Sequence, residues 1–180
     1  MKRVDRRRSE RRRQALQVVG LSFALGALVA LGLTWRLAEP EAPPAVTIAV
    51  TKSTSSLTVE DASGRVLFHA PVTSGSEHDP LPIGTWKVTT VQRMPVFNYN
   101  PDLFWDANPA HSKAKIPAGP NNPVGVVWVD LSKPHYGIHG TPEPRTVAKT
   151  QSHGCIRLTN WSAAALAEAV KPGTVALLQE

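Results

Sequence analysis

The chain has a single cysteine, Cys155, in 180 residues. It therefore cannot form an intramolecular disulfide, and Cys155 must be a free thiol, an intermolecular partner or a reactive group. A domain of about 135 residues can be stable on its core alone, so this lack does not prevent folding. The sequence also has no phosphate-binding loop, dinucleotide fingerprint or paired-carboxylate motif, which argues against nucleotide chemistry and a two-carboxylate hydrolase.

Net charge is absent from most of the chain. Residues 41–180 hold eleven basic and eleven acidic residues, whereas residues 1–40 hold nine basic and three acidic ones and account for the whole net charge of +6. A nucleic-acid footprint requires Lys and Arg on the folded domain rather than on a tail. We therefore expect no nucleic-acid partner.

One long uncharged, largely apolar run, of 22 residues, lies between Arg13 and Arg36. As a helix it would span about 33 Å at ~1.5 Å per residue, against a hydrocarbon core of about 30 Å. The basic residues before it favour a cytoplasmic N-terminus. We predict a basic cytoplasmic tail (1–13), a transmembrane signal anchor (14–36), a Pro-rich linker (37–45) and a folded domain (46–179).

A cleaved signal peptide is the main alternative to the anchor, because Ala30-Leu31-Gly32 offers small residues at a suitable spacing. The run is longer than the usual apolar core of such a signal, which favours the anchor. A buried helix is disfavoured because the run is apolar on every face. Both leading interpretations export the domain, and the anchor places it on the periplasmic side of the inner (cytoplasmic) membrane as a single-pass protein.

From Val46 onward the pattern indicates a mostly β domain. Short β-branched segments bounded by turn residues predict strands at Val46–Thr51, Ser56–Glu60, Arg65–Thr73, Gly84–Val91, Val124–Asp130, Tyr136–His139 and Thr174–Gln179. One helix is predicted over Trp161–Val170, with Thr159 or Asn160 as its N-cap. The fold class is therefore mostly β, a sandwich or barrel-like sheet with one short packed helix.

Residues 92–123 interrupt this pattern with little periodicity and many Pro and Asn residues. Loops of this length in compact domains are usually lids or binding loops. Aromatic residues in the segment either line a substrate groove or pin the loop to the core, and both interpretations stay open for Phe97, Tyr99, Phe104 and Trp105.

The segment around Cys155 favours a nucleophile over an inert thiol. A thiol with the ordinary pKa of ~8.5 is only a few per cent ionised near neutral pH, so it needs a base or a positive field nearby. His139 and His153 are the candidates. In an extended segment His153, Cys155 and Arg157 would share one face. Gly154 would let backbone N–H groups approach a ligand, as an oxyanion site requires.

These motifs resemble those of the L,D-transpeptidase catalytic domain family of bacterial cell-wall enzymes. His139-Gly140-Thr141 stands sixteen positions before the cysteine of Ser152-His153-Gly154-Cys155-Ile156-Arg157, which is the family's spacing. The segments IPAGPNNPVGVVWVDL, TPEPR and LTNW and the Gly84-Thr85 turn are also similar, so the resemblance covers roughly residues 46–179. Ala148 departs from the family, in which many members carry Gly, and this would stiffen or re-aim the loop.

The resemblance implies a two-step acyl transfer that needs no metal or other cofactor. Cys155 would attack a peptidoglycan tetrapeptide stem before its terminal D-Ala, release D-Ala and form a thioester. An acceptor then resolves the thioester: a stem diaminopimelate, a lipoprotein lysine, a free D-amino acid, or water. With water the domain would be an L,D-endopeptidase or carboxypeptidase. The sequence does not choose among these acceptors, and it leaves the oligomeric state open.

The same resemblance implies a role for each motif residue. His139 would be the base, oriented by the carbonyl of Gly140, and the N–H groups of Gly154 and Cys155 would form the oxyanion hole. We also expect the base to bring the pKa of Cys155 below its free value. Ser152, His153 and Arg157 would shape the site, and the guanidinium of Arg157 suits a substrate carboxylate.

Other interpretations of these residues stay open. His153 could serve structural hydrogen bonding and Arg157 a buried ion pair. A zinc site of His139, His153 and Cys155 is conceivable, but the neighbouring Arg157 disfavours a metal. A catalytically dead wall-binding module is disfavoured by the intact Cys and His. Four histidines lack a partnered spacing and are predicted to be surface or loop residues: His69, His78, His111 and His135.

Overall fold

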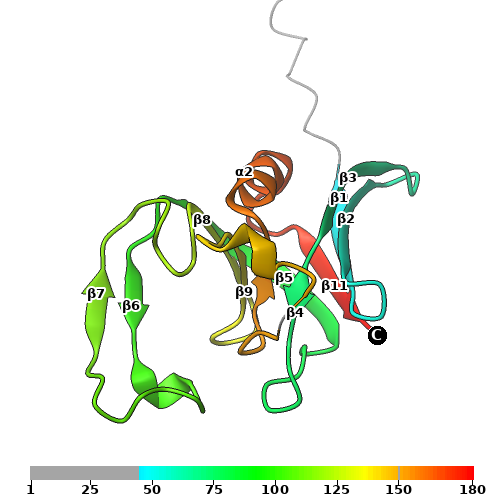
Figure 1. The fold of residues 1–180 in the computed structure, drawn as a ribbon. Helices are drawn as coiled ribbons and strands as arrows, with labels where there is room; N and C mark the ends of the chain where they lie inside the picture. Colours follow the sequence, from blue (N-terminus) through cyan, green and yellow to red (C-terminus); the bar gives the residue numbers. More distant parts are fainter. Residues whose placement is uncertain (1–44, 150) are drawn as a thin grey trace, which may run out of the picture. The chain divides into compact units, whose positions relative to one another are not determined.

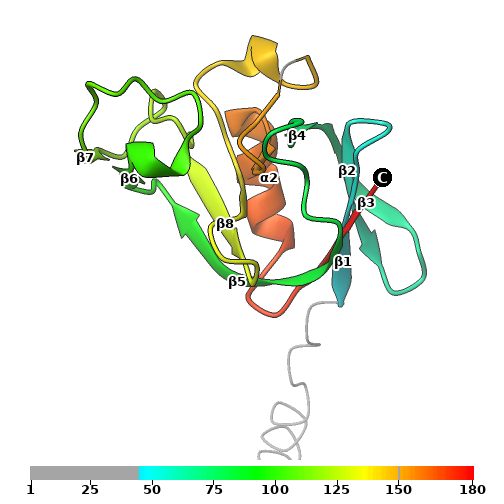
Figure 2. The same cartoon turned by 90° about the horizontal axis from the view of Figure 1, so that it is seen from below.

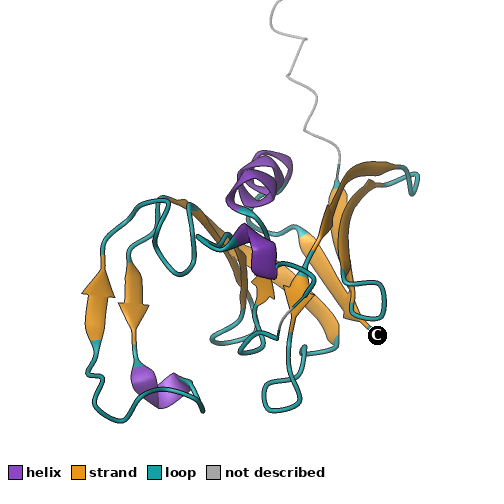
Figure 3. Cartoon of the chain, in the orientation of Figure 1, coloured by secondary structure: helices purple, strands orange, loops and turns teal. Residues whose placement is uncertain are grey.

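The computed structural model describes residues 45–149 and 151–180 (Figure 1). In chain order the elements are β1 (Val46–Thr51), β2 (Ser56–Asp61), β3 (Val66–Pro71), β4 (Thr73–Ser74), β5 (Gly84–Arg93), β6 (Phe97–Tyr99), η1 (Pro101–Leu103), β7 (Ala114–Ile116), β8 (Val127–Leu131), β9 (Gly137–His139), η2 (Pro144–Thr146), β10 (Ile156–Arg157), α2 (Asn160–Ala169) and β11 (Val175–Gln179). Strands predominate over helices in this part of the chain (Figure 3), as the sequence predicts.

The described strands form a nine-stranded sheet in the order β3-β2-β1-β11-β5-β8-β9-β10-β4, and a separate β6–β7 hairpin. β5 joins the two parts of the sheet, because its first residues pair with β11 and its later residues pair with β8. The register of β5 shifts between Val88 and Thr90, and such irregularities bend and twist a strand. Figure 2 shows β5 running from the β1–β2–β3 part to β8.

The sheet curls on itself because its two edge strands are neighbours in the sequence. β3 ends at Pro71 and β4 begins at Thr73, yet they stand at opposite ends of the strand order. Between them the N–H of Val72 donates to the carbonyl of Ser55 at 2.8 Å. The predicted strand Arg65–Thr73 is therefore confirmed over Val66–Pro71 and divided at Val72, after which the chain passes to the other edge of the sheet as β4. The result is the predicted mostly β, barrel-like sheet.

The helix α2 packs on the β8–β9 part of the sheet. Its N-cap is Thr159, whose hydroxyl accepts from the N–H of Ser162 at 3.1 Å, so the predicted helix is confirmed with a start one residue earlier. Leu166 is fully buried from the helix side. Alternating residues of β8 and β1 meet it in one core, which includes Val127, Val129, Ile48 and Val50. The apolar faces of both sheet parts are thereby covered by one short helix.

Five short elements of the described region were not predicted. Residues 97–99 and 114–116 pair as the β6–β7 hairpin within the loop 92–123, β10 is a two-residue strand after Cys155, and η1 and η2 are short 3-10 helices. All are too short to show a period in the sequence.

The predicted tail, anchor and most of the linker fall in residues 1–44, outside the described residues. Within the residues that are described, no helix is long and apolar enough to cross a membrane. The transmembrane segment therefore stays a prediction.

Candidate active site

The two candidate catalytic residues lie at the ends of neighbouring parallel strands. β9 and β10 pair with Ile138 opposite Ile156 and His139 opposite Arg157. Cys155 directly precedes β10, which places it beside Gly137 at the start of β9. A buried ladder, with Ile138 and Ile156 both at zero exposure, thus fixes the backbone that carries both groups.

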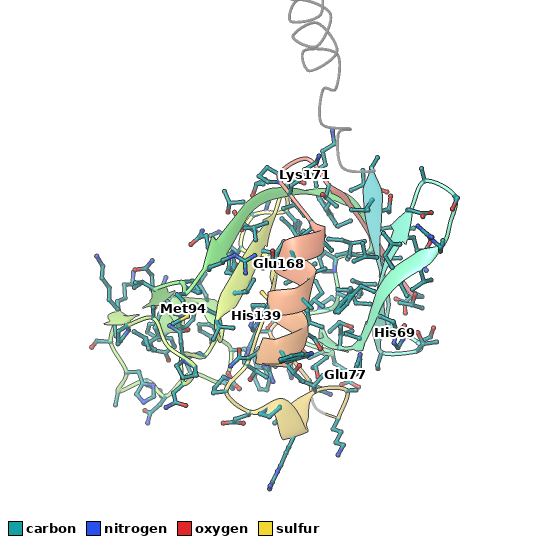
Figure 4. The ribbon with its side chains drawn as sticks, turned by 90° about the horizontal axis from the view of Figure 1, so that it is seen from above. His69, Glu77, Met94, His139, Glu168 and Lys171 are labelled. Atoms are coloured by element: carbon teal, nitrogen blue, oxygen red, sulfur yellow. The ribbon has the colours of Figure 1, made fainter. Side chains whose placement is uncertain are left out.

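His139 is held by its backbone neighbour and by an aromatic ring. Its Nδ1 donates to the carbonyl oxygen of Gly140 at 2.6 Å, so Nε2 is the unprotonated nitrogen of the neutral ring. The ring of Trp128 stacks on it at 5.5 Å. Burial lowers the pKa of His139 to about 4, and nearby Arg157 adds to this, although the Gly140 carbonyl opposes it. Figure 4 labels this side chain, which is 7% exposed.

The thiol of Cys155 is also neutral in this environment. Burial raises the pKa of Cys155 to about 11, while the Gly137 backbone and Arg157 oppose the shift. The Sγ atom lies 3.7 Å from the carbonyl oxygen of His135, to which the thiol donates. The expectation of a pKa below the free value is therefore wrong, because desolvation of the thiolate outweighs the positive charge nearby.

Two glycines of the motif are required by close contacts. Gly154 has a φ of +87°, and a Cβ there would lie 2.6 Å from Cε1 of Tyr136. A Cβ on Gly140 would overlap the side-chain oxygen of Asn160, which accepts from the N–H of Val126 at 3.1 Å.

Ser152 joins residues 151–155, the cysteine loop, to the loop between β4 and β5. Its hydroxyl donates to the carbonyl of Cys155 at 2.7 Å and accepts from the N–H of Gly75 at 2.7 Å. Its own N–H donates to the carbonyl of Gly75 at 3.1 Å. Ser152 therefore holds the backbone of the cysteine loop.

His153 contacts the 92–123 segment instead of the thiol. Its Nε2 lies 2.7 Å from a carboxylate oxygen of Asp106, and its ring meets that of Phe104 edge-on at 4.9 Å. Nothing in the local sequence links Asp106 to His153, 47 positions away, so sequence reasoning missed this partner.

Arg157 projects its charge into the site without a partner. Its side chain makes no hydrogen bond or ion pair with any other described residue. Burial lowers the pKa of Arg157, against the influence of Glu143 and Cys155. The buried ion pair considered from the sequence is therefore not seen in the described region.

One cavity of about 710 Å³ is lined by the side chains of the candidate site. His153, Cys155 and Arg157 all line it, although the backbone before Ile156 is bent and not extended. The other lining residues are Asp79, Phe97, Tyr99, Leu103, Phe104, His111, Ile116, Pro123, Val124, Trp128, His135, Tyr136, His139 and Ser152. Sequence reasoning did not single out Asp79, Trp128 or Tyr136, which come from other elements.

The aromatic residues of the 92–123 segment divide between the two roles considered. Phe97, Tyr99 and Phe104 line the cavity, whereas Trp105 stacks on His78 at 4.2 Å and is 57% exposed. The segment thus forms a wall of the cavity and is also fastened to the β4–β5 loop.

The position that departs from the family has a left-handed backbone. Ala148 has a φ of +59°, and its N–H donates to the hydroxyl of Thr73 at 2.9 Å. The loop therefore adopts a conformation suited to Gly, at a cost of about 1–2 kcal/mol for a residue with a Cβ.

A metal site finds no support in the described part of the chain. No three His, Cys, Asp or Glu side chains gather there so that they could hold a metal ion, and the trio of the zinc alternative is no exception.

A cysteine and a backbone-oriented neutral histidine at one cavity of a curled β sheet are suited to thiol-based acyl transfer. Comparison with known proteins agrees with that class. Residues 45–178 match the YkuD family, described as an L,D-transpeptidase catalytic domain, and the chain belongs to this family.

Two relatives are similar to this chain, one over most of its length and one over a short stretch. The chain is 30% identical over 152 residues to YqjB of Bacillus subtilis strain 168, named as an L,D-transpeptidase, with 81% of this chain and 78% of YqjB covered. A stretch of 55 residues is 49% identical to YkuD of Bacillus licheniformis and covers 31% of this chain. That stretch spans 33% of the length of this YkuD.

Solved structures share the fold. An L,D-transpeptidase from Mycobacterium smegmatis superposes with a TM-score of 0.61 at 21% identity, over 76% of this chain and 59% of its own. The L,D-transpeptidase LdtMt1 in complex with imipenem gives a TM-score of 0.60 at 23% identity, over 75% and 59%. At these identities the likeness concerns the fold.

Proposed function

We propose that this domain is a peptidoglycan L,D-transpeptidase in which Cys155 is the nucleophile and His139 its base. Family membership supports the reaction class. One observation carries the assignment of roles: the hydrogen bond from Nδ1 to the Gly140 carbonyl leaves Nε2 as the only ring nitrogen that can accept a proton. Both side chains line the same cavity.

The first step begins from a neutral thiol and a neutral imidazole, as the pKa shifts of Cys155 and His139 indicate. The thiol proton moves to Nε2 while Sγ attacks the carbonyl carbon that precedes the terminal D-Ala. The N–H groups of Gly154 and Cys155 receive the developing oxyanion. The imidazolium then protonates the leaving nitrogen, the C–N bond breaks, and a thioester remains.

The remaining motif residues support this step. Arg157, whose guanidinium has no partner among the described residues, binds the carboxylate of the terminal D-Ala through two N–H donors. Ser152 keeps the cysteine loop in place, and His153 connects that loop to the 92–123 segment.

Imipenem tests the proposal, because a related L,D-transpeptidase has been solved in complex with it. The purified full chain should gain the mass of one imipenem per molecule, measured by intact-protein mass spectrometry. Cys155→Ser should gain none, because its hydroxyl is far less acidic than a thiol. Labelling of Cys155→Ser equal to wild type, or no labelling of wild type, would overturn the assignment of the nucleophile.

We further propose that residues 14–36 anchor the enzyme in the cytoplasmic membrane, with the domain on the periplasmic side. The uncharged run, its Arg-rich flank and the extracytoplasmic work of the cell-wall family support this arrangement. Alkaline phosphatase fused after Glu180 should be active in cells; an inactive fusion that is stable and full-length would refute the topology.

A further inference from the structure

Two opposite charges line the cavity without pairing with each other. Asp79 lies in the loop between β4 and β5, and Arg157 lies on β10. Within the described residues, Asp79 and Arg157 form no ion pair with each other, and neither forms one with another residue. Both lie near the same thiol, because Arg157 lowers the pKa of Cys155 whereas Asp79 raises it. Among the described residues, the nucleophile is therefore flanked by a cation and an anion that form no ion pair.

The carboxylate of Asp79 lacks a donor in a position where it needs one. One of its oxygens is buried and is the only buried side-chain nitrogen or oxygen of the described residues without a hydrogen bond. Leaving such an acceptor unpaired is unfavourable. Backbone contacts hold the residue in place: its N–H donates to the hydroxyl of Ser76 at 2.9 Å, and its carbonyl accepts from the N–H of Ser76 at 2.8 Å.

The loop that carries Asp79 is fastened to the cysteine loop. Gly75, at its start, exchanges hydrogen bonds with Ser152 in both directions. A Cβ on Gly75 would overlap the backbone N of Leu81, so the loop is also closed tightly on itself. One backbone–backbone and one backbone–side-chain hydrogen bond between Gly75 and Ser152 thus tie the loop of Asp79 to the loop of Cys155.

Because the proposed reaction releases and accepts amino acids at this cavity, its opposite charges suit a ligand that carries both signs. We infer that Asp79 and Arg157 form a zwitterion subsite, in which Asp79 binds the amino group of the departing or incoming amino acid and Arg157 its carboxylate. This inference rests on the proposed function. It assigns Asp79, which lies outside the cysteine motif, the binding of the amino group, and it assigns Arg157 the selection of amines whose carbon also bears a carboxylate.

In the second step the bound ammonium releases one proton to solvent, and its nitrogen then forms a bond to the thioester carbonyl carbon. The C–S bond breaks, His139 takes a second proton from the nitrogen, and that proton returns to sulfur. One ammonium and one thioester thereby give one amide, one thiol and one free proton.

Acceptor kinetics with matched amines test the subsite. A tetrapeptide stem serves as a saturating donor, and mass spectrometry follows exchange of its terminal residue. The acceptors are D-methionine, which has both charges, and D-methioninamide, which keeps the amine and lacks the carboxylate. Asp79→Asn should raise the KM of both acceptors about 10- to 100-fold, the range for losing one hydrogen bond to a charged group. Arg157→Gln should raise the KM of D-methionine only.

The matched control is Glu77→Gln, which removes the same charge from the same loop (Figure 4) at a residue that does not line the cavity. It should change neither KM. Imipenem acylation of each variant reports the first step separately. Equal KM values for Asp79→Asn and Glu77→Gln, with acylation intact, would overturn the subsite alone, whereas no acylation of wild type would overturn the proposed function. If Asp79→Asn does not fold, Asp79→Ser gives the same comparison.

Discussion

The two walls of the cavity are held together in different ways. The strand wall consists of β8, β9 and the Cys155 loop up to β10, where backbone ladders and the Gly140 and Ser152 hydrogen bonds fix each group. The loop wall, residues 94–123, contains the short β6–β7 hairpin and depends mainly on side-chain contacts. His139 in the strand wall is 7% exposed, whereas the side chain of Asp106 in the loop wall is 49% exposed.

This difference separates the groups that react from the groups that surround the substrate. Proton transfer requires fixed distances, and a buried ladder supplies them. The loop wall presents aromatic surface, and side-chain contacts near water cost little free energy to rearrange. We therefore expect substitutions in the strand wall to reduce the rate of chemistry and those in the loop wall to weaken substrate binding.

The largest effect is expected for His139→Ala. Loss of the base should reduce the rate of acyl transfer about 10²–10⁴-fold, measured as acylation by imipenem and as tetrapeptide exchange. For wild type, the pKa of about 4 for His139 keeps the imidazole neutral above that pH. The acid limb of the acylation rate should therefore fall near pH 4 and not near the ordinary ~6.5.

Thiol alkylation distinguishes burial from activation by the base. Because burial raises the pKa of Cys155 to about 11, the rate of iodoacetamide labelling should still rise above pH 8.5 in wild type and in His139→Ala. A wild-type midpoint below ~8.5 that moves upward in His139→Ala would show instead that the resting pair is a thiolate and an imidazolium.

A smaller effect is expected for Asp106→Asn in the loop wall. The contact with His153 at 2.7 Å is partly exposed, and such pairs are worth about 0.2–1 kcal/mol. We expect the KM of the tetrapeptide donor to rise no more than about fivefold, with kcat unchanged. Steady-state exchange kinetics measure both constants.

Asp102→Asn is the control for this variant, because Asp102 belongs to the same wall and pairs with Lys113 at 3.3 Å. Within the described residues, His153 makes its ion and ring contacts with other residues of this wall and not with Asp102 or Lys113. Asp102→Asn should leave both the KM of the tetrapeptide donor and kcat unchanged. A hundredfold loss of kcat in Asp106→Asn would contradict the division between the two walls, since the strand wall would then depend on the loop wall.

The local sequence was sufficient for much of the fold. Residues only a few positions apart determine the alternating pattern of β1 and β2. They also determine the start of α2, where Thr159 is the N-cap. The resemblance to a known family, and not the local sequence, implied that His139 and Cys155 share one site. The strand prediction failed at Val72, where the chain leaves one edge of the sheet for the other.

The sequence by itself determined which chemical groups the two motifs carry, and its resemblance to a known family implied that these groups meet at one site. Only the tertiary structure decided the charge state of Cys155, since burial depends on β9, β10 and the loops packed around them. The tertiary structure also decided which charged residues, far from Cys155 in the sequence, lie near its thiol. Asp79 lies 76 positions before Cys155 in the chain, and the pairing of β4 with β10, together with the hydrogen bonds between Gly75 and Ser152, brings their loops together.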